Sequence, residues 1–188
     1  MAENNEVKSN AVDKSGEEQL AYLGINPENL NGRVLELGSG KSEKLKEVSG
    51  LPDNCEIISL SKNVLNGIDP YINTLRKKPG WDKKTIQADA LAIPFADETF
   101  DYVFSVDAIP HFLTSDVQIR TAFGEIWRIL KSKGEARLFP VNERDLERAQ
   151  DLFGKLGGNI SLQLVNRDTL RKYGYFDKSA QRLIIKKP

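Results

Sequence analysis

The residues most suited to chemistry lie in one short segment, residues 33–40. An apolar run there contains the carboxylate of Glu36 and then reaches two glycines, Gly38 and Gly40. This pattern predicts a buried parallel strand followed by a tight turn, where the backbone can approach a ligand without a Cβ in the way. A helix beginning near Ser42 would direct its first N–H groups at the same point. The segment therefore predicts a binding site for a nucleotide-like ligand.

Two common nucleotide-binding motifs do not match this turn. A phosphate-binding P-loop requires a glycine five residues before its Gly-Lys pair, and that position is Leu35. A dinucleotide site requires a small third residue, and that position is Glu43. A third interpretation makes Glu36 a polar anchor for a cofactor that carries an amino group and a positive charge. Taken alone, the segment is equally consistent with a simple turn in which Glu36 is solvated.

Further motifs follow in a fixed order and support the third interpretation. They are the segments 88–101 (ADALAIPFADETFD), 102–105 (YVFS), 109–112 (IPHF) and 125–134 (EIWRILKSKG). In order and spacing, the chain from about residue 31 to 141 resembles the class I S-adenosylmethionine-dependent methyltransferases, in particular the group that methylates small molecules such as quinone precursors. The joint match is far more specific than any one motif.

The resemblance implies that S-adenosylmethionine is the cofactor and that its amino-acid end lies at the glycine turn. Gly38, Ser39 and Gly40 would bring the backbone close to that end, and Glu36 would hold the loop and the ammonium group, directly or through water. The alternative for Glu36 is a local role, in which it only caps the following turn.

The end of the second strand departs from the family pattern. Members usually have an acidic residue there that accepts hydrogen bonds from the ribose hydroxyls, whereas this chain has Ser59 followed by Leu60. Replacing a charge-assisted pair by a hydroxyl would forfeit about 1–3 kcal/mol, or one to two decades of affinity. Cofactor binding would then be weak, unless Asn63 or Asp69 supplies the missing contact.

The other implied site residues follow the third and fourth strands. Asp89, Ala90 and Leu91 match the place where the family holds adenine, although Asp89 could instead cap a turn. Ser105 and Val106, with Asp107, end the fourth strand beside the expected sulfonium, where acceptor and cofactor would meet and where open α/β sheets bind ligands. His111 is the only histidine; it is a candidate for catalysis or for orienting the acceptor, and a surface or packing role is the alternative.

The elements that must position these residues alternate along the chain, which predicts a parallel sheet with helices on both faces. The expected fold is α/β, Rossmann-like and doubly wound, with a mostly parallel seven-stranded sheet; the resemblance further implies that the last two strands form an antiparallel hairpin at one edge of it. Strands are expected at residues 33–37, 56–60, 85–88, 102–106, 135–141, 160–165 and 182–186, and helices at 17–23, 42–49, 69–78, 115–133 and 146–156. Ser115 and Gln118 predict a capping box. Trp127 and Trp81 are interpreted as packing residues, and Arg128 as a solvated helix residue.

Composition narrows the class of protein without selecting a function. The chain has 188 residues, with 27 Lys and Arg against 27 Asp and Glu, so no global field draws it to nucleic acid. Residues 1–16 form a polar tail that we expect to be disordered, and residues 17–188 form a single methyltransferase-like domain. A lone cysteine, Cys55, excludes an internal disulfide, and no zinc-binding pattern is present, so no metal is expected. No leader or membrane segment is evident, which predicts a cytoplasmic protein.

Two functions of different class remain. The first is a methyltransferase that acts on an unidentified acceptor, with a small molecule or a protein ahead of nucleic acid. The second is a catalytically degenerate domain of the same fold that binds a partner. Little structure is expected to cover the acceptor side, so we predict an open site. Such a site suits a macromolecular acceptor, or a small acceptor covered by a second subunit in a homodimer or by the N-terminal tail.

Overall fold

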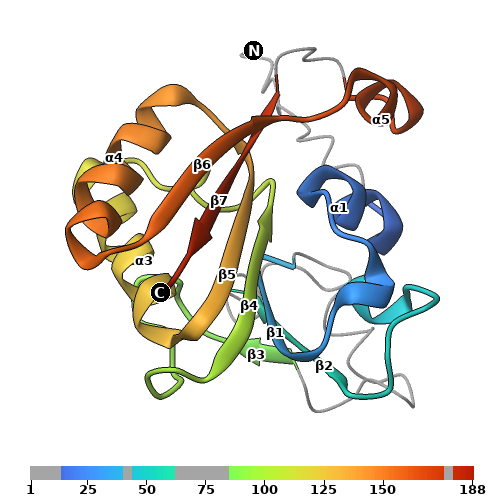
Figure 1. Cartoon of the computed structure of the whole chain (residues 1–188), viewed down its shortest axis with the longest axis horizontal. Helices are drawn as coiled ribbons and strands as arrows, with labels where there is room; N and C mark the ends of the chain where they lie inside the picture. The colour runs from blue at the N-terminus through green and yellow to red at the C-terminus, as the bar shows by residue number, and fades with distance from the viewer. Residues whose placement is uncertain (1–13, 40–43, 62–84, 176–179) are drawn as a thin grey trace, which may run out of the picture.

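The computed structural model describes residues 14–39, 44–61, 85–175 and 180–188. In this part of the chain, seven strands form one sheet in the order β3-β2-β1-β4-β5-β7-β6 (Figure 1). The strands are β1 (Gly32–Leu37), β2 (Cys55–Ser61), β3 (Thr85–Gln87), β4 (Phe100–Val106), β5 (Leu130–Val141), β6 (Asn159–Leu164) and β7 (Gln181–Lys186). The helices are α1 (Gly16–Leu23), α3 (Asp116–Ile129), α4 (Glu143–Phe153) and α5 (Arg167–Lys172), with short 3₁₀ turns η1 (Pro27–Asn29), η2 (Lys44–Glu47) and η3 (Gly154–Leu156).

The strand directions confirm the predicted fold class. β1 to β5 pair in parallel, and β7 runs antiparallel to both β5 and β6. The strand order reverses between β1 and β4, where Leu37 lies opposite Leu60 on one side and Ser105 on the other. Such a reversal point is where open α/β sheets form a ligand crevice at the carboxyl ends of the strands.

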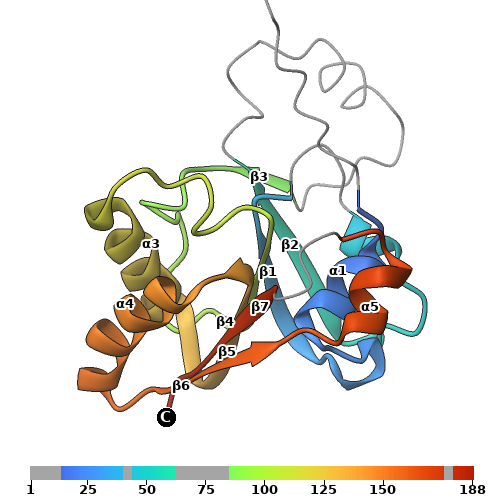
Figure 2. The ribbon, with the colours of Figure 1, turned by 90° about the horizontal axis from the view of Figure 1, so that it is seen from above.

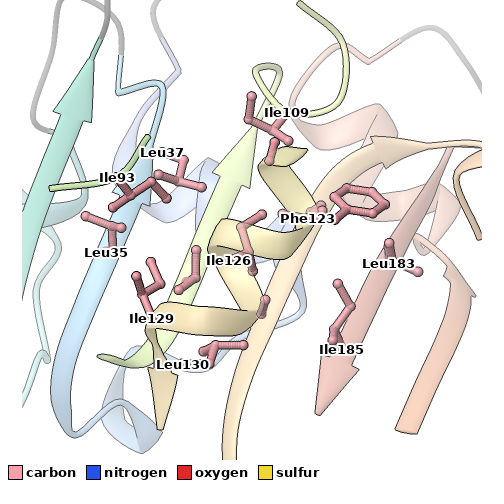
Figure 3. Close-up of a cluster of buried hydrophobic side chains, with 14 of the residues drawn as sticks. Leu35, Leu37, Ile93, Ile109, Phe123, Ile126, Ile129, Leu130, Leu183 and Ile185 are labelled. Carbon is pink, nitrogen blue, oxygen red and sulfur yellow. The ribbon is translucent and has the colours of Figure 1, made fainter. Parts of the chain in front are cut away.

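Helices cover both faces of the sheet, with α3 and α4 on one side and α1 and α5 on the other (Figure 2). On the first side, Phe123, Ile126 and Ile129 of α3 are fully buried against the sheet (Figure 3). Their spacing of three residues is the helical periodicity that the sequence predicts. This apolar face fixes α3 beside the loop that follows β4.

On the other side, an aromatic cluster joins α1 to the sheet. The Tyr22 ring stacks on Phe139 of β5, with ring centroids 4.6 Å apart. Tyr173 and Tyr175, which follow α5, meet the Tyr22 ring edge-on at 5.9 and 5.6 Å. α1 and α5 are therefore held together by aromatic contacts near the carboxyl edge of β5.

The start of α3 differs in detail from the predicted capping box. The Ser115 hydroxyl accepts a hydrogen bond from the Gln118 N–H at 3.3 Å, as predicted. The Gln118 side chain accepts from the N–H of Thr114 at 2.9 Å, one residue before the N-cap. Both side chains therefore accept hydrogen bonds from backbone N–H groups at the start of the helix. The second bond of a capping box is displaced by one residue, because it comes from Thr114 and not from the N-cap residue.

The boundary between α3 and β5 also differs from the prediction. The helix ends at Ile129 and β5 begins at Leu130, whereas the sequence predicts a helix through residues 131–133. Residues between Leu130 and Glu135 form a bulge, since the pairing with β4 shifts there, and Lys133 has a φ of +66°. The charged residues that resemble a last helical turn therefore belong to an irregular strand.

Two other predicted helices have different outcomes, and one helix was not predicted. Of the helix expected at 42–49, the structure describes only the 3₁₀ turn η2. The helix expected at 69–78, together with Asn63 and Trp81, lies outside the described residues. α5 was not predicted, because it has six residues of which only Leu170 is buried and so leaves no periodic pattern.

Candidate functional site

The carboxyl ends of four strands bring most of the predicted site residues to one edge of the sheet. Glu36 of β1 lies opposite Ser59 of β2, and Leu37 lies opposite Ser105 of β4. β3 continues this edge beyond β2, and Asp89 follows it. The chain segments that the sequence assigns to one ligand therefore do converge, although they are up to about 70 residues apart in sequence.

Gly38 is required by the geometry of the turn. Its φ is +75°, and its N–H donates to the Leu60 carbonyl at 2.7 Å. A Cβ at this position would approach the Ala108 Cβ more closely than the 3.0 Å below which real Cβ atoms essentially never come. The turn after β1 therefore packs directly on the loop after β4, and only glycine permits this. Ser39 is half-buried beside it, and Gly40 lies outside the described residues.

Glu36 and Ser59 form a buried polar pair. The Ser59 hydroxyl donates to Glu36 Oε2 at 2.8 Å, and the side chains are 0 % and 2 % exposed. In this structure Ser59 therefore faces its neighbouring strand. The neighbouring Leu60 side chain is buried in the core, and its backbone carbonyl supports the Gly38 turn. Contact of either residue with a ribose stays a prediction.

Ser105 ties the loop after β4 to the end of β1. Its hydroxyl oxygen accepts from the Ile109 N–H at 2.8 Å and donates to the Leu37 carbonyl at 3.3 Å. The residue is fully buried, so in this structure it positions the loop that carries Ala108. Contact of Ser105 with a cofactor stays a prediction.

Asp89 organises the turn after β3. Its Oδ1 accepts from the Leu91 N–H at 3.1 Å, and its carbonyl accepts from the Ala92 N–H at 3.0 Å. The local capping role that the sequence left open is therefore present. Asp89, Ala90 and Leu91 are each half-buried, and Ala90 and Leu91 pack at the edge of the core. The predicted adenine contacts remain compatible with this placement and stay a prediction.

The loop after this turn is held by two residues of α3. Arg128 donates to the carbonyl oxygens of Phe95 and Ile93 at 2.7 and 2.9 Å, and Glu125 accepts from the Ile93 N–H at 2.7 Å. Arg128 and Glu125 also bind each other at 2.8 Å. The hydrogen bond from Arg128 is the main reason that the pKa of Glu125 lies below its usual value, with the Ile93 N–H adding to it.

The prediction that Arg128 is a solvated helix residue is therefore wrong. An irregular loop has backbone groups that no strand or helix satisfies, and a guanidinium supplies several donors at once. The backbone groups of this loop that need a partner are what explains Arg128, and they become apparent only in the folded chain. Trp127 behaves as predicted and stacks on Phe153 with ring centroids 5.2 Å apart.

His111 lies in the loop between β4 and α3 and is exposed. Ile109 and Pro110 before it are buried, whereas Phe112 after it is 76 % exposed. The loop is therefore anchored at its beginning and presents His111 and Phe112 to solvent. The catalytic or acceptor-orienting role of His111 stays a prediction.

A lysine from the N-terminal segment reaches the end of β4, which sequence reasoning missed. The Lys14 ammonium forms an ion pair with Asp107 and lies over the rings of Tyr22 and Tyr175, at 5.7 and 5.6 Å from their centroids. Burial lowers the pKa of Lys14, while the charge of Glu18 acts in the opposite direction. Lys14 belongs to a polar sequence segment with no pattern, so only the folded chain places it here.

Within the described ranges, no group of three or more His, Cys, Asp or Glu side chains could hold a metal ion. None of the described helices is both long and apolar enough to cross a membrane.

Comparison with known proteins connects this edge to a family. Residues 35–138, more than half of the chain and extending from β1 into β5, match the family model described as a methyltransferase domain. Sterol 24-C-methyltransferase erg6 of Schizosaccharomyces pombe is 33 % identical over 124 residues, which are 63 % of this chain and 29 % of that protein. The chain thus spans under a third of that curated relative.

Solved structures share the fold at lower identity. Haemonchus contortus phosphoethanolamine N-methyltransferase 2, in complex with S-adenosyl-L-methionine, superposes with a TM-score of 0.59 at 17 % identity, over 92 % of this chain and 52 % of that one. A SAM-dependent methyltransferase from Thermotoga maritima gives 0.57 at 18 % identity, over 93 % and 90 %.

Proposed function

The chain belongs to the class I S-adenosylmethionine-dependent methyltransferases, and we propose that it transfers a methyl group from that cofactor to an acceptor bound at the carboxyl edge of the sheet. The observation that carries the proposal is the contact between the Gly38 turn and Ala108. It brings the glycine turn after β1 and the loop after β4 together at the point where the strand order reverses.

The residues at this edge fit the cofactor. Gly38 is exposed at this edge, although Ala108 fills the space that a Cβ would take, so its backbone is accessible to a ligand; the Glu36 carboxylate, two residues earlier, is buried. We assign Glu36, Gly38, Ser39 and Gly40 to the amino-acid end of the cofactor. Asp89, Ala90 and Leu91 are assigned to the adenine, and Ser59 and Leu60 to the ribose side. Ser105 holds the loop that completes the site.

When bound, the cofactor supplies a methyl group on a positively charged sulfonium. The chain's own contribution is position and a fixed electrostatic environment. The Gly38 turn fixes one side of the site, while Arg128 and Glu125 fix the loop on the other. Asp107 places a negative charge at the end of β4, and His111 stands exposed in the same loop as the candidate acceptor-orienting residue.

One observation favours the alternative, a degenerate domain that binds a partner. The family's acidic residue at the end of β2 is replaced by Ser59, whose hydroxyl is already bound to Glu36. A ribose would then find no carboxylate at this position, and the cofactor would bind weakly. We rank methyl transfer first, because the turn at Gly38, the Asp89 turn and the loop after β4 are all in place.

The class of acceptor is inferred from the amino-acid composition. We favour a small molecule or a protein side chain over nucleic acid, since the chain carries 27 basic and 27 acidic residues. A homodimer would cover the exposed His111 and Phe112.

The test combines turnover with matched variants. Purified chain is incubated with methyl-labelled S-adenosylmethionine and pools of amines, phenols and proteins, and S-adenosylhomocysteine release is measured together with label transfer. Asp89→Ala is expected to lower cofactor affinity at least several-fold. Asp53→Ala, an exposed carboxylate at the opposite edge of the sheet, is the control and should leave the affinity unchanged.

Cofactor binding without turnover on any pool would favour the degenerate domain. Equal affinities of the wild type and the Asp89→Ala variant would remove Asp89 from the site.

A further inference from the structure

Three groups from distant parts of the chain surround one positive charge. Asp107 provides a carboxylate, Tyr22 and Tyr175 provide ring faces, and the enclosed charge is the ammonium of Lys14. Lys14 is 19 % exposed at its side chain, so the charge is largely removed from water. A carboxylate together with aromatic faces is the combination that recognises alkylammonium groups.

This cation cage, formed by Asp107, Tyr22 and Tyr175, stands beside the proposed methyl-transfer site. Asp107 follows β4 directly and precedes Ala108, the residue that touches the Gly38 turn. The Asp107 N–H donates to the Phe139 carbonyl at 2.7 Å, and Tyr22 stacks on the Phe139 ring. The cage is therefore attached to β4, which borders the reversal point, and to the neighbouring β5.

The cage is built rigidly. Tyr22 is fully buried with Lys14 over its ring, and its hydroxyl donates to Glu18 at 2.8 Å. Tyr175 packs on Phe139 with ring centroids 5.2 Å apart. Asp107 has a φ of +52°, a conformation that few non-glycine residues adopt, and backbone of this kind is concentrated at functional sites.

The position of Lys14 shows what such a site accepts. Its side chain is an unbranched alkyl chain that ends in an ammonium, and it reaches the cage from a segment ahead of α1. Lys14 lies in neither a strand nor a helix, so its contacts with the cage do not follow from secondary structure. The ammonium therefore behaves as a resident ligand of the cage.

We propose that the cage is the acceptor subsite and binds a primary alkylamine, which displaces the Lys14 side chain. The inference rests on the proposed function and names its substrate class. In the transfer step, the bound ammonium gives a proton to the Asp107 carboxylate. The amine nitrogen then forms a bond to the methyl carbon, the carbon–sulfur bond breaks, and its electron pair stays on sulfur, so that the sulfonium becomes a neutral thioether. The nitrogen carries the positive charge in the product.

The binding experiment uses Lys14→Met, which keeps an apolar chain and removes the charge. n-Butylamine is titrated calorimetrically into the wild type and the variant. A variant without the resident ligand should bind n-butylamine at least about tenfold more tightly, because a competing occupant lowers apparent affinity by the fraction of open sites. n-Butanol, its neutral analogue, should not bind.

Two matched variants control the result. Lys172→Met removes a lysine that lies over the Tyr173 ring, at 5.0 Å from its centroid, and is exposed. It should leave n-butylamine binding at the wild-type level. Lys14→Met combined with Asp107→Asn should lose the gained affinity. Circular dichroism confirms that each variant is folded.

The outcomes separate this inference from the proposed function. If folded Lys14→Met binds S-adenosylhomocysteine but gains no affinity for n-butylamine, Lys14 is only a structural latch and the inference is overturned. If the amine binds but S-adenosylhomocysteine does not, the proposed function fails while the cage remains an amine site.

Two sources of alkylamine are distinguished by turnover. n-Butylamine and a lysine-containing peptide are each incubated with the chain and S-adenosylmethionine, and the products are analysed by mass spectrometry. Methylation of the first identifies a small amine, and methylation of the second a protein side chain. Methylation of Lys14 alone, with neither added amine modified, would contradict displacement by an external acceptor.

Discussion

Gly38→Ala should destabilise the fold through the contact that defines the site. The left-handed backbone at φ +75° costs an alanine about 1–2 kcal/mol. The new methyl group would also overlap the Ala108 Cβ, and relieving an overlap of this kind in packed structure costs about 1–3 kcal/mol. The variant should therefore lose about 2–5 kcal/mol, a large part of the about 5–15 kcal/mol by which domains are stable.

Urea denaturation followed by circular dichroism measures this loss. Gly124→Ala is the matched control, because Gly124 lies within α3 and a Cβ there would meet no atom within 4 Å. The control should gain up to about 1 kcal/mol, the difference in helix propensity between the two residues.

A double variant isolates the overlap from the backbone term. Adding Ala108→Gly to Gly38→Ala removes the methyl group that the new Cβ would meet, so the two changes should couple favourably by about 1–3 kcal/mol. The cost of placing an alanine in the left-handed backbone conformation at position 38 should remain. A Gly38→Ala variant as stable as the wild type, or two changes that are simply additive, would refute the packing of the two loops on each other.

Substitutions at three further positions test the surroundings of the site and, at Asp101, the opposite edge of the sheet. Arg128→Met should lower S-adenosylhomocysteine affinity several-fold in calorimetry by freeing the loop at Ile93 and Phe95, and Arg128→Lys should not restore it, because lysine lacks the planar set of donors. Ser59→Asp should destabilise the fold by about 2–4 kcal/mol in urea, since it buries a second carboxylate against Glu36; a stable variant with tighter cofactor binding would show that position 59 faces the ligand. Asp101→Asn should be less stable than the wild type at neutral pH. Burial alone would raise the pKa of Asp101, but hydrogen bonds from Lys131 and the Arg33 N–H outweigh it and lower the pKa. The stabilisation by the ionised Asp101 carboxylate is then present above the ordinary pKa of 3.8, and it is lost as the pH falls through the lowered pKa of the folded state. The urea midpoints of the wild type and Asp101→Asn should therefore become equal in acid. A difference between the two midpoints that stays constant from neutral pH into acid would contradict this.

The fold and the turn could be predicted because their signals are local. Alternating apolar segments and turn residues give the strand sequence, and glycine spacing gives the turn at Gly38. The alternation of strands and helices predicts the parallel sheet, and the family resemblance implies the final antiparallel pair. The bulge between Leu130 and Glu135 could not be predicted, because its charged residues have the same pattern as the end of a helix.

The parts of the site that escaped prediction depend on pairing across the sheet or across the chain. The hydrogen bond between Ser59 and Glu36 requires the register of β1 and β2, which no local pattern contains. Arg128 is recognisable only when the loop it supports is folded against α3. Lys14 and Asp107 are 93 residues apart, and neither has a neighbour in sequence that suggests the pairing.

The most direct test of the account is a calorimetric comparison of three nucleotides with the unaltered chain. S-adenosylhomocysteine, NAD and ATP are titrated in turn under the same conditions. We expect saturable binding of one S-adenosylhomocysteine per chain at or below about millimolar concentration, with no competition from NAD or ATP. No heat of binding with millimolar S-adenosylhomocysteine, or displacement of it by either of the other two, would contradict the assignment of the carboxyl edge as the cofactor site.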